Sequence, residues 1–167
     1  DDHRVLIAGG ATTAYFANTT AGCWMFDTDT DTFTALADMP AGRSCGMMAV
    51  YGSMAYFFGG VDVDMLAHDD IFAYDIIGNE WSTVGAMPGD LVNAAVVSTG
   101  HGSILLIGGE TFFSWYDSGL TKAYAFDTLT YEVLGWASVR VFGVLLCVSA
   151  VSGLIGGIAA RAWHRVA

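Results

Sequence analysis

The chain has 167 residues, of which 54% are hydrophobic and only 14% are charged, and its formal net charge is −11. Residues 1–135 hold all 17 acidic residues and three basic ones, a net charge of −14, whereas residues 136–167 hold three arginines and no acid. An acidic globular part repels phosphate backbones, so no nucleic-acid partner is expected. Cys23, Cys45 and Cys147 do not have the spacing of zinc ligands, and small buried thiols are favoured over a Cys23–Cys45 disulfide.

Pairs of glycines divide the chain into repeats. A short apolar run ends in such a pair three times, at Gly9-Gly10, Gly59-Gly60 and Gly108-Gly109, with spacings of 50 and 49 residues. Short apolar runs that are bounded by turn residues predict β-strands. A glycine pair at the end of a strand lets the backbone take positive φ and lets a neighbouring sheet approach closely. The sequence therefore predicts stacked sheets with a period of about 50 residues.

An aromatic residue followed by aspartate forms the second repeated feature. It occurs at Phe26-Asp27, Tyr74-Asp75 and Phe126-Asp127. The aspartate is predicted to open a turn by accepting hydrogen bonds from the backbone that follows it. Six residues after each aspartate stands a bulky apolar residue, predicted to fill the space between neighbouring sheets: Phe33, Trp81 and Val133.

In chain order, residues 5–36 predict three strands of a first sheet, residues 44–84 four strands of a second, and residues 93–134 four strands of a third. Four strands in a period near 50 residues are typical of a β-propeller blade. Closed propellers have about four to eight blades, so about three blades would expose two sheet edges. We expect further N-terminal repeats or a second subunit to complete the ring.

These features resemble the kelch-repeat family. The resemblance rests on the glycine pairs, on the aromatic-Asp steps and on the bulky residue that follows them, with Tyr74…Trp81 as the best copy. The recurring steps Met39-Pro40 and Met87-Pro88 also resemble kelch repeats. The resemblance covers about residues 5–135 and implies an all-β fold, a partial kelch-type propeller of about three blades of four antiparallel strands. Kelch propellers mostly bind proteins and sometimes host enzymes.

The C-terminal part has a different composition. After a linker at residues 136–140, residues 141–160 hold 14 apolar residues, four glycines and two serines, without any charge. A helix of this length would cross the hydrocarbon layer of a bilayer, which is about 30 Å thick. The sequence predicts one transmembrane helix there, followed by a basic tail at residues 161–167. The two arginines of this tail favour a C-terminus on the cytoplasmic or equivalent side.

Small residues form one face of the predicted helix. Ser149, Gly153 and Gly157 stand four residues apart, the spacing at which two membrane helices can pack closely, and Gly156 belongs to the neighbouring row of small residues. We therefore expect contact with another subunit's helix or self-association through the membrane helix. His164 follows the span and is interpreted as an interfacial anchor rather than a cofactor ligand.

A loop rich in aromatic residues is the predicted protein-binding site. It contains Phe112, Phe113, Trp115 and Tyr116, and loops at one face of a propeller are where partners usually dock.

Two acidic segments were weighed as metal sites. Asp27, Asp29, Asp31 and Asp38 have a calcium-loop-like spacing, but Thr32 stands where such a loop requires glycine. The segment Asp62–Asp70 contains four aspartates and His68 but has no second histidine nearby. Solvated turns are favoured for both segments, and no metal, cofactor or catalytic residue is predicted.

Together these features predict a membrane-anchored kelch-repeat protein that acts as a structural or protein-docking subunit of a larger membrane complex. Its expected partners are other protein subunits and membrane lipid. The alternative is a membrane-tethered enzyme on a kelch propeller, possibly directed at carbohydrate.

Overall fold

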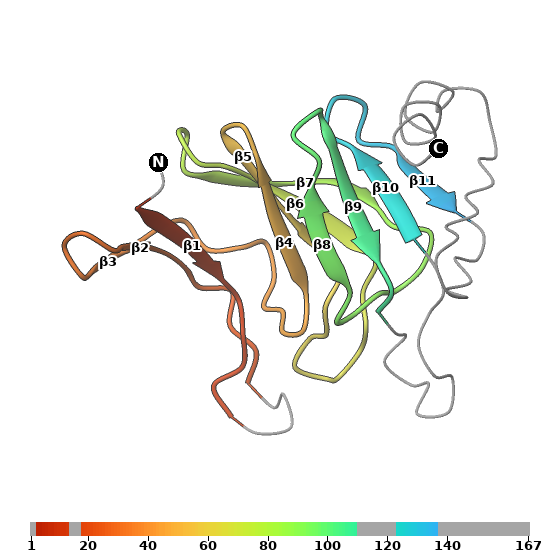
Figure 1. Cartoon of the computed structure of the whole chain (residues 1–167). Helices are drawn as coiled ribbons and strands as arrows, with labels where there is room; N and C mark the ends of the chain where they lie inside the picture. Colours follow the sequence, from red (N-terminus) through yellow and green to blue (C-terminus); the bar gives the residue numbers. More distant parts are fainter. Residues whose placement is uncertain (1–2, 14–17, 110–122, 137–167) are drawn as a thin grey trace, which may run out of the picture.

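The computed structural model describes residues 3–13, 18–109 and 123–136, and this part of the chain is all-β (Figure 1). The first sheet consists of β1 (Arg4–Ala8), β2 (Cys23–Asp27) and β3 (Thr32–Ala35). The second sheet consists of β4 (Met47–Tyr51), β5 (Met54–Phe58), β6 (Asp70–Asp75) and β7 (Glu80–Ala86). The third sheet consists of β8 (Ala95–Ser98), β9 (Ser103–Ile107), β10 (Ala123–Asp127) and β11 (Val133–Trp136).

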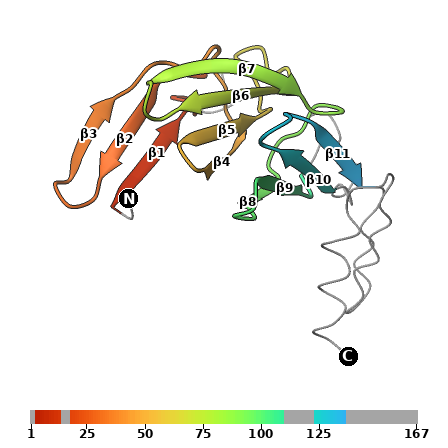
Figure 2. The same cartoon turned by 90° about the horizontal axis from the view of Figure 1, so that it is seen from above.

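Each sheet is an antiparallel meander. The strand orders are β1-β2-β3, β4-β5-β6-β7 and β8-β9-β10-β11, and all paired strands are antiparallel. Figure 2 shows the three sheets fanned around an arc, with β4 and β8 on its concave side and β3, β7 and β11 on its convex side. The predicted all-β fold of repeated sheets is confirmed, including a first sheet whose described strands lack the innermost one.

The turns after the aromatic-Asp steps have the predicted chemistry. In the second sheet, Asp75 Oδ1 accepts hydrogen bonds from the backbone N–H groups of Ile77 at 2.9 Å and Gly78 at 3.1 Å. Asp27 and Asp127 do the same in the first and third sheets. These bonds from the backbone lower the pKa of Asp27 and Asp127. The aspartate therefore fixes a hairpin of the same design in every sheet.

The glycine pairs join one sheet to the next. All six glycines have positive φ, between 58° and 109°. The N–H of Gly10 donates to the carbonyl oxygen of Arg43 at 2.8 Å, and the N–H of Gly60 donates to that of Leu91 at 3.3 Å. Arg43 and Leu91 thus hold equivalent places, each just before the inner strand of the next sheet. A side chain at Gly9 would come within 2.6 Å of the Arg43 carbonyl oxygen, so the close approach requires glycine.

The core lies between the sheets and is filled by aromatic and aliphatic side chains. Between the second and third sheets, Tyr56, Phe58 and Phe126 are buried, and the Phe58 and Phe126 rings meet edge to face at 5.3 Å. Between the first and second sheets, Phe57 and Phe72 pack with Met39 against small residues of the first sheet and its connections. Burial of each such side chain contributes about 1.5–3 kcal/mol.

Trp81 shows how one sheet attaches to the preceding one. Its ring lies 4.9 Å from that of Tyr74, and its indole N–H donates to the carbonyl oxygen of Ala37 at 2.9 Å. The side-chain oxygen of Asn79 accepts the N–H of the same Ala37 at 2.8 Å. The second sheet therefore holds both backbone groups of Ala37, a residue that follows the first sheet.

The prediction that the bulky residue fills the space between sheets holds for Trp81 and Val133 but is wrong for Phe33. Phe33 stands at the place of Trp81, yet it is 64% exposed. The physical reason is that no other sheet of the described residues covers this face of the first sheet (Figure 2).

The predicted membrane span at residues 141–160 lies outside the described residues. Within residues 3–13, 18–109 and 123–136, no helix is long and apolar enough to cross a membrane.

Candidate functional site

The side of the first sheet that faces away from the second sheet is uniformly apolar. The strand registers Val5↔Phe26↔Phe33 and Ile7↔Trp24↔Ala35 place six side chains on this side. We call them the open face: Val5, Ile7, Trp24, Phe26, Phe33 and Ala35. None of them carries a charge, although the chain as a whole is acidic.

The open face is exposed where its counterpart in the second sheet is buried. Val5 is 48% exposed and Ile7 39%, whereas Ala55 and Phe57, at the same places relative to the glycine pair, are no more than 4% exposed. The difference arises because the first sheet covers the second, while none of the described residues covers the first. Apolar patches that remain exposed on a folded domain commonly mark interaction surfaces.

Two aromatic rings are held in place at the convex side of the open face. The Phe26 and Phe33 rings lie 4.6 Å apart with 34° between their planes. The corresponding Tyr74 and Trp81 rings lie 4.9 Å apart at 32°, and there they pack against the first sheet's connection. The open face thus presents the same ring geometry that already forms a sheet-to-sheet interface elsewhere in this chain.

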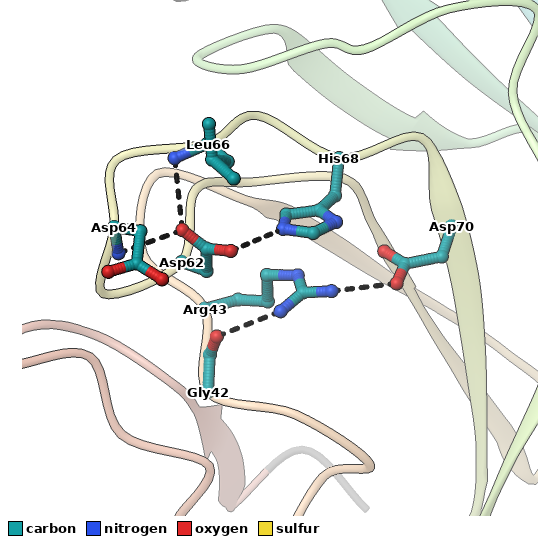
Figure 3. Close-up of polar contacts among 7 residues, drawn as sticks. All are labelled: Gly42, Arg43, Asp62, Asp64, Leu66, His68 and Asp70. Carbon is teal, nitrogen blue, oxygen red and sulfur yellow. Dashed lines mark hydrogen bonds and ion pairs between the residues drawn. The ribbon is translucent and has the colours of Figure 1, made fainter.

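A group of interacting polar side chains lies in the loop between β5 and β6 (Figure 3). Asp62 Oδ1 accepts hydrogen bonds from the N–H groups of Asp64 and Leu66, each at 2.9 Å. Asp62 Oδ2 lies 2.8 Å from Nε2 of His68. Burial alone would raise the pKa of Asp62, but the bonds from His68, Leu66 and Asp64 outweigh it and lower that pKa. The carboxylate therefore organises its own loop and orients the imidazole.

Arg43 forms a buried ion pair next to this loop. Ser44 pairs with Val61 in an isolated β-bridge, which places Arg43 beside the start of the loop. Arg43 is 5% exposed, and its Nη2 lies 2.8 Å from Asp70 Oδ2. Its guanidinium also lies 5.6 Å above the ring of Phe72, a cation–π contact.

Three polar atoms around the ion pair are buried and have no hydrogen-bond partner in the described part of the chain: Arg43 Nε, Ser44 Oγ and Asp70 Oδ1. They are a donor, a hydroxyl and an acceptor, all enclosed by protein atoms. Within the described ranges, no cluster of three or more His, Cys, Asp or Glu side chains is arranged to hold a metal ion.

The Asp62 loop is expected to respond to acid. Because the folded-state pKa of Asp62 is depressed, its contribution to stability is present above the unfolded-state pKa of about 3.9 and is lost as the pH falls through the lower folded value. The amide signals of Asp64 and Leu66 in NMR spectra should therefore titrate together below pH 4.

The matched control is Asp62→Asn, which keeps an acceptor oxygen but cannot ionise. In this variant the acid titration of the two amide signals should disappear. An unchanged titration would show that another group controls the loop.

The structure does not describe the site residues that the sequence predicts. Phe112, Phe113, Trp115 and Tyr116 belong to residues 110–122, and Ser149, Gly153, Gly156 and Gly157 belong to residues 137–167; both ranges lie outside the described residues. Neither set is tested by the structure.

The cysteines and acidic segments weighed in the sequence can be placed. Cys23 and Cys45 are not joined to each other by a disulfide. Burial together with the charge of Asp38 raises the pKa of Cys23 to about 11. Asp62 accepts hydrogen bonds from two backbone N–H groups of its own loop, and its second carboxylate oxygen contacts His68.

Sequence reasoning missed the open face and the Arg43–Asp70 pair. The apolar character of the open face could have been found from the alternation Val5, Ile7 and Trp24, Phe26. The ion pair joins residues 27 positions apart, and no local signal announces it.

The geometry of the second sheet agrees with a known repeat. Residues 42–88 match the family model described as "Kelch motif". Residues 42–88 thus resemble a kelch repeat. The matched range contains the whole of β4–β7, and the kelch repeat includes Arg43, Asp62, His68 and Asp70. No curated protein matches the chain.

Among solved structures, the chain titled "Structure of YjhT" is similar in fold. The TM-score is 0.63 with 20% sequence identity, and the similarity covers 80% of this chain and 48% of that chain. This chain therefore spans about half the length of the YjhT chain. At this identity the likeness concerns the fold alone, and it covers more of the chain than residues 42–88.

Proposed function

We propose that this propeller-type domain is a protein-docking subunit, and that its open face is the docking surface. The observation that supports this most is the exposure of Val5, Ile7 and Phe33 on a face whose counterpart in the second sheet buries Ala55 and Phe57. Interfaces that bind tightly are centred on such apolar and aromatic anchors. The occupant that fits is a β-sheet of a partner subunit.

The interface between the first two sheets indicates what this partner sheet offers. There, large side chains of the second sheet, including Phe57 and Trp81, pack on the small residues Ala8, Ala21 and Ala41. The open face supplies the large side chains again, through Trp24, Phe26 and Phe33. A partner sheet with small side chains and a free backbone carbonyl near its edge would therefore complete the same packing.

The experiment compares two variants in the native assembly after mild detergent extraction. Phe33→Asp places a charge in the open face, whereas Ile77→Asp places one in an exposed turn of the second sheet. We expect the wild-type chain and the Ile77→Asp variant to elute in a large assembly with defined foreign subunits. The amount of the Phe33→Asp variant in that assembly should be at least tenfold lower.

Equal amounts of the Phe33→Asp and Ile77→Asp variants in the large assembly would contradict the docking role. A free monomer with additional N-terminal sheets in its intact mass would contradict it as well, because the open face would then be covered by the same polypeptide.

The membrane anchor and the docking role are separate proposals. The anchor rests on the composition of residues 141–160 and their flanking arginines. The docking role rests on the open face and is independent of whether the chain is tethered.

A catalytic function is the second candidate, and the orientation of His68 by Asp62 favours it. A carboxylate that holds an imidazole at 2.8 Å can prepare it as a general base. The substrate class expected for this candidate is carbohydrate. Titration with neutral monosaccharides, followed by the ring signals of His68 in NMR spectra, tests this; no shift up to millimolar sugar would contradict it.

A further inference from the structure

The fourth residue after each turn aspartate has the same uncommon backbone conformation in all three sheets. These residues are Asp31, Asn79 and Tyr131, and their φ angles are 52°, 54° and 58°. A left-handed conformation is uncommon in a residue with a side chain, and asparagine and aspartate adopt it more readily than most. The three side chains therefore leave the backbone at equivalent places, in the turn before the outermost strand of each sheet.

In the second sheet this turn residue is attached to the preceding sheet. Asn79 Oδ1 accepts the backbone N–H of Ala37 at 2.8 Å, and Ala37 follows the last strand of the first sheet. The same oxygen accepts the hydroxyl of Tyr74 at 2.8 Å, so a residue of its own sheet holds the amide in position. The turn residue thus acts as a hydrogen-bond acceptor in the interface between the two sheets.

In the third sheet the equivalent residue also reaches the preceding sheet. The Tyr131 ring lies 6.5 Å from the ring of Tyr56, which belongs to the second sheet. A side chain at Gly85 of the second sheet would lie 3.5 Å from the backbone oxygen of Tyr131. Both interfaces between the described sheets therefore use the left-handed turn residue, one through a hydrogen bond and the other through a ring contact.

In the first sheet the equivalent residue is Asp31, which is exposed. Its carboxylate forms no hydrogen bond or ion pair with another described residue. The registers Phe26↔Phe33 and Tyr74↔Trp81 show that Phe26 stands in the place of Tyr74, and phenylalanine has no hydroxyl group to donate. An ionised carboxylate only accepts hydrogen bonds, so a neighbour that covers this turn must supply a donor.

We propose that Asp31 is the polar anchor of the docking surface and accepts a backbone N–H of the partner's sheet. This inference rests on the proposed docking role of the open face. Continuity with the interface between the first two sheets assigns the donor, because Asn79 accepts the N–H of Ala37 from the equivalent place. The partner that fits has a segment that follows its outermost strand and presents an N–H group to the turn.

The anchor adds specificity to an otherwise apolar surface. A hydrogen bond from a backbone N–H to a carboxylate is roughly twice as strong as one between neutral groups. A partner that presents a carbonyl oxygen at the same place would face a negative charge and leave both acceptors without a donor. Asp31 therefore selects the backbone orientation of the partner's segment, whereas the rings of Phe26 and Phe33 supply the apolar contact.

Two variants of Asn79 test, within the chain itself, whether a carboxylate can make this bond. Asn79→Gly removes the acceptor but tolerates the positive φ, so the urea midpoint should fall. Asn79→Asp should unfold close to the wild-type midpoint at an ionic strength of about 0.15 M, where neighbouring surface charges are screened. An Asn79→Asp variant as unstable as Asn79→Gly would overturn the proposal, because a carboxylate could then not replace the amide.

The matching variants of Asp31 test the contact in the native assembly after mild detergent extraction. Asp31→Gly should keep the wild-type urea midpoint, yet its amount in the large assembly should be about tenfold lower, the loss expected for a hydrogen bond to a charged group. Asp31→Asn retains an acceptor oxygen and should stay at the wild-type level. Asp29→Asn removes a charge from the same turn and is the control, also expected at the wild-type level.

The outcomes separate this inference from the docking role. If Asp31→Gly stays at the wild-type level while Phe33→Asp is depleted, the anchor is overturned and the docking role stands. Depletion of Asp31→Asn to the level of Asp31→Gly also overturns the proposal, because the partner would then recognise the charge through a cationic side chain. Equal amounts of Phe33→Asp and Ile77→Asp mean that the docking role itself has failed.

Discussion

Replacing Arg43 by leucine is expected to lower the free energy of unfolding by about 3 kcal/mol, because Asp70 loses the partner of its partly buried charge. This value lies at the low end for buried ion pairs, since the Asp70 side chain is 26% exposed and partly solvated. Chemical denaturation of the wild-type chain and the Arg43→Leu variant measures the difference.

The third sheet supplies the control for this prediction. Leucine occupies the equivalent place there, as Leu91, and it is buried without an ion pair. The double variant Arg43→Leu with Asp70→Leu should therefore recover most of the lost stability, because an apolar pair can replace a buried ion pair at little cost. A double variant as unstable as the sum of its single variants would show that the two side chains act independently.

Replacing Gly59 by alanine is expected to cost about 3–4 kcal/mol. The positive φ of 58° accounts for about 1–2 kcal/mol in a residue with a side chain. The new methyl group would also overlap the Leu91 carbonyl oxygen and come within 2.9 Å of that of His68, and such overpacking costs about 1–3 kcal/mol. Both oxygens belong to the backbone, so neither can avoid the methyl group by a change of side-chain rotamer.

Gly52→Ala is the matched control for Gly59→Ala. Gly52 has almost the same φ, 62°, but nothing lies within 4 Å of the place where its side chain would be. The free energy of unfolding of the Gly52→Ala variant should fall only by the cost of the positive φ, about 1–2 kcal/mol. Urea denaturation measures the free energy of unfolding of both variants. Equal decreases in the two variants would mean that the backbone around Gly59 can shift to accommodate a methyl group, so that close approach of the sheets is not required.

The fold could be predicted from the sequence because each repeat carries its own turn chemistry. Asp27, Asp75 and Asp127 bond to residues two and three positions ahead, so a local pattern determines a local structure. The glycine pairs are equally local in sequence, and their positive φ follows from the residue type. Period and strand order then follow from repetition.

The candidate site could not be predicted in the same way. Arg43 and Asp70, or Trp81 and Ala37, meet only after two sheets have packed, and the sequence separates them by 27 and 44 residues. Phe33 has the residue type of a buried position and lies exposed, because burial depends on a neighbouring sheet rather than on the residue itself. The exposure of such a side chain therefore depends on which sheets surround it, and the sequence of its own repeat does not contain that information.

Photo-cross-linking from position 33 tests the docking role most directly. A benzophenone amino acid replaces Phe33 in the full chain in its native cells, and the cross-linked peptides are identified by mass spectrometry. The docking proposal predicts adducts with a β-sheet of one defined partner protein and none from the same amino acid at Ile77. Adducts confined to the chain's own polypeptide, or equal adducts from both positions, would contradict it.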